Sequence, residues 1–270
     1  MIDNIIFLGT AGDAVVYGKQ HRASGGIILK LERMQFHLDP GPGAIVRAQQ
    51  MKLNIRETTA ILVSNRSILR SSDLNSLVGG MTYEGLDHKG VVIAKKNVVQ
   101  ASEESLKTPI LQDEAKNFIE RIIGLEPDQR VGIGNIEIKS TFCHEVDSIG
   151  FKIITPHYII GYTSDTEYSE KLVQEFKDCN ILLVNCKNPE SVTEKHAMNT
   201  LNVIKLAEKI KPDLLVMTGF GIKMLEQNPI AEARKVQKDT GIQVIAAKDG
   251  LILNPDSYSS GKKQTQLANF

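Results

Sequence analysis

The chain has 270 residues, of which 41% are hydrophobic and 24% are charged, and its 32 basic and 32 acidic residues give a formal net charge of zero. This composition is typical of a globular protein with a sizeable core, and the balanced charge argues against a general affinity for nucleic acid or acidic membranes. We expect no membrane span, because no segment approaches about 18 consecutive apolar residues. We also expect no secretory signal, because the first residues lack a basic leader and a cleavage site.

The first third of the chain is rich in short strands. A loop of alternating proline and glycine at 39–43 restricts the backbone and precedes a predicted helix over Ala44–Leu53. A further apolar strand begins at Ala60 and runs through a loop into a helix that ends near Met81. The earlier strands are expected at Ile5–Leu8, Gly26–Leu31 and Met34–Leu38.

The middle of the chain combines one predicted helix with several strands. The helix is expected over Asp113–Ile123, where apolar residues recur at helical spacing, and a charged loop follows at 126–130. The strands are expected at Val91–Ala94, Ile136–Phe142, Ile149–Ile154 and Tyr158–Gly161.

The last third alternates helices with strands, a pattern that favours a layered α/β protein. We find no linker and no repeat, so one domain is expected over 1–255, followed by a polar and loosely ordered tail at 256–270. Cys143, Cys179 and Cys186 lie in apolar contexts, which predicts buried free thiols and a reducing, cytoplasmic location. The elements are expected at Glu167–Lys177, Ile181–Val184, Glu194–Lys209, Leu214–Met217, Ile222–Lys238, Val244–Ala246 and Leu251–Leu253.

Six segments, taken in order, resemble those of the metallo-β-lactamase-fold hydrolases related to ribonuclease Z. They extend over nearly the whole chain, and the resemblance implies an αββα sandwich of four layers, with two sheets between outer helices. The segments are FLGTAGD at 7–13, RASGGIIL at 22–29, LDPGPGA at 38–44, GYTSDTEY at 161–168, MTGFGIKML at 217–225 and VIAAKDGLIL at 244–253.

The resemblance also implies where a metal centre would lie. In the resembling hydrolases, a strand ends in a His-x-His-x-Asp-His motif that helps to hold two metal ions, and such ions activate water from about 3.5–4 Å apart. A further histidine ligand falls at Gly219. The motif positions are occupied here by Asn65, Ser67, Leu69 and Arg70. Imidazole and carboxylate, which zinc prefers, are therefore missing from most of the expected ligand positions.

Three positions keep the residue type that the resemblance implies. His144 and Asp165 match metal ligands, and His196 matches a catalytic histidine that is not a ligand. Because each lost ligand costs several kcal/mol, we do not expect a dinuclear centre. The favoured interpretation makes His144 and Asp165 remnants that bond to each other or to the backbone, and the alternative gives them a residual single zinc or other divalent metal. Without an activated water, catalysis by His196 is not favoured.

The charged residues that follow the strand at Ala60 allow a second hypothesis. If a pocket persists, the guanidinium groups of Arg66 and Arg70 could replace the metal charge and hold a phosphate or carboxylate. Loop arginines more often point into solvent, and that orientation is the expectation here. Asp73 precedes a predicted helix and is expected to cap it rather than to bind metal.

Together these features predict a metallo-β-lactamase-fold protein with a dismantled di-metal site, inactive as a hydrolase and acting as a binding or partner subunit. The alternative is a metal-dependent hydrolase, of phosphodiesterase or nuclease type, with one weakly held metal. The resemblance makes a homodimer or a pairing with an active paralogue a natural arrangement, and it leaves the ligand unidentified. The candidate ligand-binding residues are Arg66, Arg70, His144 and His196.

Overall fold

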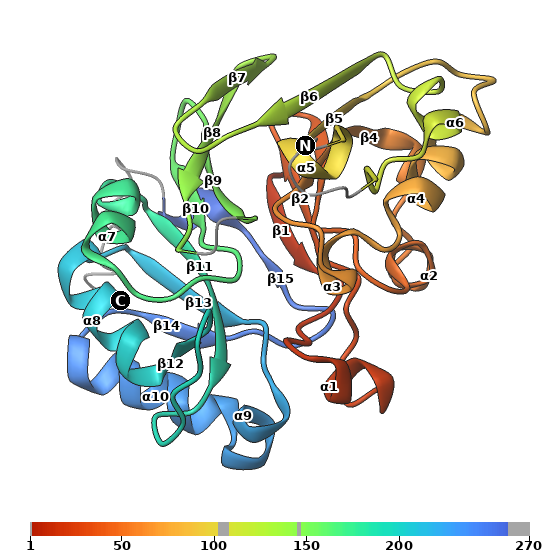
Figure 1. Ribbon diagram of the computed structural model, residues 1–270. Helices are drawn as coiled ribbons and strands as arrows, with labels where there is room; N and C mark the ends of the chain where they lie inside the picture. The colour runs from red at the N-terminus through yellow and green to blue at the C-terminus, as the bar shows by residue number, and fades with distance from the viewer. Residues whose placement is uncertain (1, 102–107, 145–146, 259–270) are drawn as a thin grey trace, which may run out of the picture.

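Two β-sheets face each other in the computed structural model, which describes residues 2–101, 108–144 and 147–258 (Figure 1). The first sheet has seven strands in the order β15-β1-β2-β3-β4-β5-β6, and its strands run parallel from β3 to β6. The strands are β1 (Asn4–Phe7), β2 (Ile27–Leu31), β3 (Met34–Leu38), β4 (Thr58–Val63), β5 (Val91–Lys95), β6 (Arg121–Leu125) and β15 (Ile252–Leu253).

The second sheet has eight strands in the order β14-β13-β11-β10-β9-β8-β7, with β12 paired to β11. Strands β10, β11, β13 and β14 are parallel, so their carboxyl ends meet at one edge. The strands are β7 (Arg130–Ile133), β8 (Ile136–Phe142), β9 (Ile149–Ile154), β10 (Ile159–Tyr162), β11 (Ile181–Asn188), β12 (Met198–Asn199), β13 (Leu214–Thr218) and β14 (Val244–Ala246).

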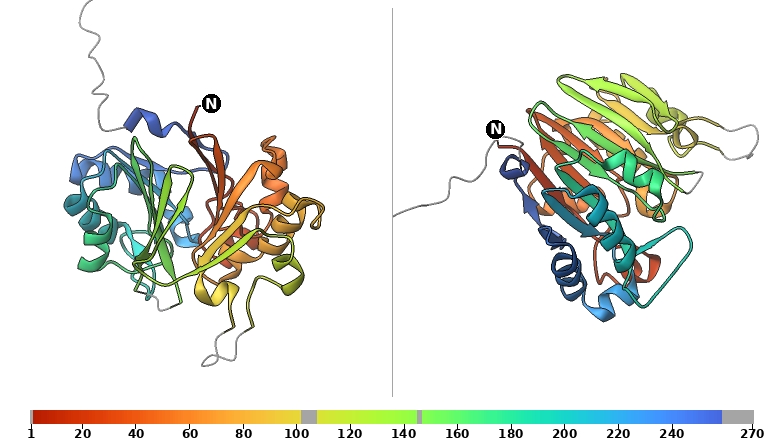
Figure 2. Two further views of the ribbon diagram at one scale, coloured as in Figure 1. Left: turned by 90° about the horizontal axis from the view of Figure 1, so that it is seen from above. Right: turned by 90° about the vertical axis from the view of Figure 1, so that its left-hand side faces the viewer.

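Helices cover the outer side of each sheet, and Figure 2 shows the resulting layers. α4 and α6 pack on the first sheet, and α7, α8 and α10 pack on the second. The expected four-layer αββα sandwich is therefore confirmed. The helices are α1 (Ala14–Gly18), α2 (Ala44–Gln50), α3 (Ile68–Ser71), α4 (Leu74–Thr82), α5 (Lys96–Val99), α6 (Asp113–Lys116), α7 (Glu170–Phe176), α8 (Thr200–Ile210), α9 (Ile222–Gln227) and α10 (Pro229–Thr240), with 3₁₀ turns at Ile55–Glu57 and Pro255–Tyr258.

The alternation of side chains along the strands explains the layering. In β4, Ala60 and Leu62 face the core between the sheets, whereas Ile61 and Val63 face the helices. Because successive strand residues point to opposite faces, a strand that is apolar throughout must be covered on both sides. Apolar strands such as β4 therefore lie in the middle of the sandwich.

Three predicted helices differ most from the structure, and those expected over Ala44–Leu53 and Glu167–Lys177 are shortened to α2 and α7. The helix expected over Asp113–Ile123 ends at Lys116, and Arg121–Leu125 instead pairs in parallel with β5, which suits its β-branched Ile122 and Ile123. The helix expected from Glu194 begins at Thr200, because Asn199 caps it in a reciprocal capping box. The helix expected over Ile222–Lys238 is broken into α9 and α10 by Asn228 and Pro229.

The remaining expectations concern the cysteines, the tail and membranes. All three cysteines are buried free thiols, as predicted. The tail begins with the 3₁₀ turn that ends at Tyr258, and residues 259–270 lie outside the described part of the chain. Among the described residues, no helix has the length and apolar character to cross a membrane.

Candidate functional site

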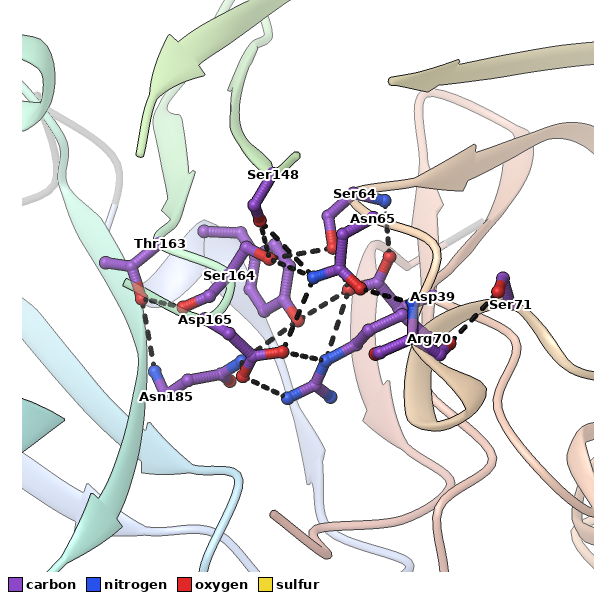
Figure 3. Close-up of polar contacts among 12 residues, drawn as sticks. Asp39, Ser64, Asn65, Arg70, Ser71, Ser148, Thr163, Ser164, Asp165 and Asn185 are labelled. Carbon is purple, nitrogen blue, oxygen red and sulfur yellow. Dashed lines mark hydrogen bonds and ion pairs between the residues drawn. The ribbon is translucent and has the colours of Figure 1, made fainter. Parts of the chain in front are cut away.

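The candidate site lies where loops at the carboxyl ends of strands from both sheets meet (Figure 3). Asp39 follows β3, and Asn65 follows β4. From the second sheet, Asp165 follows β10 and Asn185 lies near the end of β11. Carboxyl ends of parallel strands are a common place for ligand sites in α/β proteins, because the loops there converge.

An ion pair between Arg70 and Asp165 forms the centre of this site. The Arg70 Nε lies 2.9 Å from Asp165 Oδ2, and its Nη2 lies 2.6 Å from Oδ1, so the pair is bidentate. The Arg70 side chain is 8% exposed and that of Asp165 is 39% exposed. The expectation that Arg70 points into solvent is therefore wrong, because the carboxylate at the carboxyl end of β10 draws the guanidinium into the site.

Two amides complete the hydrogen bonding of Asp165. Asn185 donates to Oδ1 from 3.0 Å, and Asn65 donates to Oδ2 from 3.4 Å. Burial alone would raise the pKa of Asp165, but the Arg70 charge and these hydrogen bonds outweigh it and hold the pKa below its usual value. Each carboxylate oxygen thus accepts from one guanidinium nitrogen and one amide.

A second carboxyl group, that of Asp39, lies beneath the ion pair. Its Oδ1 accepts from the Ser64 N–H at 2.7 Å, and its Oδ2 accepts from the hydroxyls of Ser64 and Tyr162, both at 2.7 Å. The Arg70 Nε lies 3.9 Å from Oδ2. Burial nevertheless raises the pKa of Asp39 to about 6, because it outweighs Arg70 and the hydrogen bonds. The site therefore holds one permanent cation and two carboxyl groups.

Hydroxyl groups link the two sheets around this cluster. Ser164 donates to Ser64 Oγ at 2.7 Å, and the Asn65 amide donates to Ser148 Oγ from 3.3 Å (Figure 3). These residues come from loops after β4 and β10 and from the start of β9. The polar network thus ties the loops of both sheets to the Arg70–Asp165 pair.

The loop at 39–43 allows α3 to carry Arg70 close to the site. A Cβ atom on Gly41 would lie only 2.2 Å from the Leu69 carbonyl oxygen, so only glycine fits this contact. Asp73, expected to cap its own helix, makes no such bond and instead accepts from the Ala44 N–H at 2.9 Å. It therefore caps α2, whose N-cap residue is Gly43 and carries no side chain.

The positions that the resemblance assigns to metal ligands differ in their surroundings. The Asn65 side chain belongs to the buried cluster, whereas Ser67 is exposed at the start of α3 and Leu69 is half-buried. Gly219 has a φ of +67°, and a Cβ atom there would lie 3.1 Å from the Asn185 side chain. Asn185 was missed by the sequence analysis, although it follows the apolar run Ile181–Val184 at a carboxyl strand end.

The retained histidines lie apart from the Arg70–Asp165 pair, at the rim of the site. His144 Nε2 lies 3.7 Å from Glu167 Oε2, and His196 Nδ1 lies 3.8 Å from Glu167 Oε1. The two rings lie 6.4 Å apart, and the His144 and His196 side chains are 53% and 54% exposed. His144 therefore faces Glu167, which the sequence analysis did not select, rather than Asp165. We call these three residues the rim cluster.

Arg66 lines the same cavity as Asp165 and His196, and its guanidinium is held by backbone carbonyls. Its Nη1 donates to the Asn97 carbonyl at 2.6 Å and its Nη2 to the Thr108 carbonyl at 2.9 Å, so it does not simply point into solvent as expected. It contributes to a cavity of about 230 Å³ at the mouth of the site. The lining residues are Asn65, Arg66, Ser67, Asp147, Asp165 and His196.

These residues do not fit the pair of metal ions that the resemblance implies. The Arg70 cation lies on the carboxylate that would bridge the ions, and Asn65 offers an amide where an imidazole is expected. Within the described ranges, no group of three or more histidine, cysteine, aspartate or glutamate side chains is arranged to hold a metal ion. The donor set is thus unsuited to a two-metal mechanism.

Comparisons with known structures agree with the observed architecture. The metallo-β-lactamase fold protein YhfI from Bacillus subtilis superimposes with a TM-score of 0.77 at 17% identity, covering 94% of this chain and 99% of that one. The short form of human tRNase Z superimposes with a TM-score of 0.66 at 14% identity, covering 93% of this chain and 98% of that one. At these identities, the similarity demonstrates the fold.

Sequence comparison adds a nearer relative. No family model matches the sequence. The uncharacterized protein MJ1374 of Methanocaldococcus jannaschii is 32% identical over 267 residues, which cover 97% of this chain and 98% of the relative. The chain therefore belongs to the same family as MJ1374, and it has the metallo-β-lactamase fold.

Proposed function

We propose that this protein is a metal-independent member of the metallo-β-lactamase fold that acts as a binding or partner subunit rather than as a hydrolase. The bidentate pair between Arg70 and Asp165 carries this proposal. In it, a guanidinium supplies the positive charge that metal ions supply in hydrolases of this fold. The charge holds the loops of the two sheets together but cannot activate water, because arginine does not deprotonate and is not a Lewis acid.

Electrostatics support this assignment. A divalent ion about 4 Å from the Arg70 guanidinium would be repelled by about 8 kcal/mol at an effective dielectric constant of about 20. It would also have to displace two charge-assisted hydrogen bonds from Asp165. The histidine ligands whose binding energy would offset this repulsion are replaced by Asn65 and Gly219. Arg70 and a metal ion on Asp165 are thus mutually exclusive in this proposal.

The binding surface in this proposal is the mouth of the site. The cavity there presents Arg66 and His196, and His144 lies next to His196 across Glu167. Arg70 contributes indirectly, by fixing Asp165 in the wall of the cavity. The occupant is a small polar ligand or a polar side chain of a partner, which is either a second copy of the chain or an active paralogue.

A second candidate function is a hydrolase, of phosphodiesterase or nuclease type, with a single weakly held metal. The rim cluster favours it, because the His144 and His196 imidazoles lie 3.7 Å and 3.8 Å from the Glu167 carboxylate, although the described residues include no ready-made group of three metal ligands. In this alternative, the metal would be held from the rim by His144, and Asp165 would contribute only after release from Arg70.

Metal analysis of the full-length chain separates the two candidates. The protein would be produced in medium supplemented with zinc, manganese and iron, purified without chelator, and analysed by mass spectrometry of the elements. The proposal expects no stoichiometric metal and no metal-dependent cleavage of bis(p-nitrophenyl) phosphate. Stoichiometric metal that is lost in His144→Ala, together with such cleavage, would establish the hydrolase instead.

A ligand-restored variant tests the assignment of the site. Because a side chain at Gly219 would meet Asn185, the restoration includes shortening of Asn185. The variant is expected to bind zinc, and a folded variant that binds none would show that the positions were wrongly assigned. The substitutions are Asn65→His, Ser67→His, Leu69→Asp, Arg70→His, Asn185→Ala and Gly219→His.

A further inference from the structure

A small cavity lies next to the Arg70–Asp165 pair, distinct from the larger cavity at the mouth of the site. Its volume is about 10 Å³, which is about the space that one water-sized molecule needs. Asp39, Arg70 and Asn185 line it, and Thr218 and Gly219 close it at the carboxyl end of β13. The cavity therefore has polar groups in part of its wall and is too small for an organic ligand.

The Asn185 side chain provides an unsatisfied acceptor beside this cavity. Asn185 is 5% exposed, and its Oδ1 is buried without a hydrogen-bond partner among the described residues. Its Nδ2 donates to Asp165 Oδ1 at 3.0 Å and to the Tyr162 hydroxyl at 3.3 Å. Rotating the amide by half a turn would place Oδ1 against the Asp165 carboxylate, so this orientation is fixed by electrostatics.

The position of Oδ1 directs it toward Gly219. A Cβ atom added at Gly219 would lie 3.1 Å from Oδ1, so the absent side chain leaves room beside the acceptor. A buried amide oxygen requires a donor, and neither an anion nor an apolar atom can serve.

We propose that this cavity is a binding site for a single hydrogen-bond donor with one heavy atom, either water or ammonium, which donates to Asn185 Oδ1. The donor fills the room that the missing side chain at Gly219 leaves, and it completes the hydrogen bonding of the amide that positions Asp165. The inference rests on the same Arg70–Asp165 pair as the proposed function. The two can fail independently, because metal analysis tests the proposed function, whereas electron density and melting temperatures test the occupant of this cavity.

A crystal structure of the full-length chain, grown without ammonium and at a resolution that shows ordered water, tests the proposal. The expected result is one density peak within hydrogen-bond distance of Asn185 Oδ1, either in this crystal or after a soak in ammonium chloride, and a well-ordered site without such a peak under both conditions would overturn it. In Asn185→Leu, which removes the acceptor but keeps the bulk, the peak is expected to disappear. A peak that persists in this variant would also overturn the proposal.

Melting temperatures in sodium, choline and ammonium chloride at equal ionic strength identify the occupant. Equal values, together with the peak in the ammonium-free crystal, assign the site to water. A rise with ammonium alone, which Asn185→Leu abolishes, assigns it to ammonium. A rise with ammonium that Asn185→Leu leaves unchanged would contradict binding at this position.

Discussion

Both the interior of the site and its rim pair a basic side chain with a carboxylate, but the interior pair is buried and directly hydrogen-bonded, whereas the rim pairs are exposed and longer. In the interior, the Arg70 side chain is 8% exposed and makes two direct hydrogen bonds to Asp165. At the rim, the His144 and His196 side chains are more than half exposed and approach the Glu167 oxygens no closer than 3.7 Å. Burial strengthens a fixed charge pair, whereas solvent screens an exposed one.

This difference separates the part of the site in which protein charge neutralises buried carboxyl groups from the part in which solvent screens the charges. Without a cation, the buried carboxyl groups of the interior would be unpaired, which is costly. Arg70 neutralises the charge of Asp165 through a direct ion pair at 2.6 Å, and it partly offsets the charge of Asp39 from 3.9 Å. At the rim, the His144 and His196 side chains are more than half exposed, so solvent screens their charges and no comparable cost arises.

Removing the interior cation should have the largest effect. Arg70→Met leaves Asp39 and Asp165 without their cation and should lower the free energy of unfolding by about 4 kcal/mol. Urea denaturation at neutral pH measures this loss. Arg66→Met is the matched control, because the Arg66 guanidinium donates to the backbone carbonyls of Asn97 and Thr108 and not to the buried carboxylates. An equal loss of unfolding free energy in Arg70→Met and Arg66→Met would contradict the claim that the interior cation stabilises the fold more than a cation at the rim.

The second largest effect concerns pH. The folded-state pKa of Asp39 is raised to about 6 from a reference of 3.8, so the protonated carboxyl stabilises the fold below pH 4 and this contribution is lost as pH rises to 6. The stability of the wild type relative to Asp39→Asn should therefore fall by about 3 kcal/mol between those values and then stay level. Urea denaturation across this range measures the difference.

The comparison with Asp39→Asn isolates one group. His37, whose pKa burial lowers to about 4, changes the stability of both proteins in the opposite direction and cancels in the difference. A difference that is independent of pH, or that grows as pH rises, would contradict the raised pKa of Asp39.

The smallest effect is expected at the rim. Glu167→Gln removes the charge that faces His144 and His196, and the free energy of unfolding should change by less than about 1 kcal/mol, because the pairs are long and exposed. The same denaturation assay measures the change. A loss as large as that of Arg70→Met would show that the rim is structural.

The sequence predicted the fold more fully than the site. Runs such as Ile181–Val184 are apolar at every position, which requires cover on both faces and identifies central strands. At Arg121–Leu125, by contrast, helical spacing and strand propensity compete over five residues. Pairing with β5 decided between them, and no local pattern could reveal that neighbour.

The residue types of the site were predictable, but their contacts were not. The strand-end motif identified Arg70, and the segment GYTSDTEY identified Asp165, yet the orientation of Arg70 depends on this carboxylate 95 positions away in the chain. Asn185 could have been selected as a polar residue at the carboxyl end of an apolar strand. Its role became visible only with the close approach of Gly219.

A double-mutant cycle between Arg70 and Asp165 tests the central claim most directly. Unfolding free energies would be measured at neutral pH for the wild type, Arg70→Met, Asp165→Asn and the double variant. If the guanidinium replaces metal charge at this carboxylate, the coupling energy should be about 2 kcal/mol and favourable. A coupling energy below about 0.5 kcal/mol would show that the two residues act independently and would contradict the account.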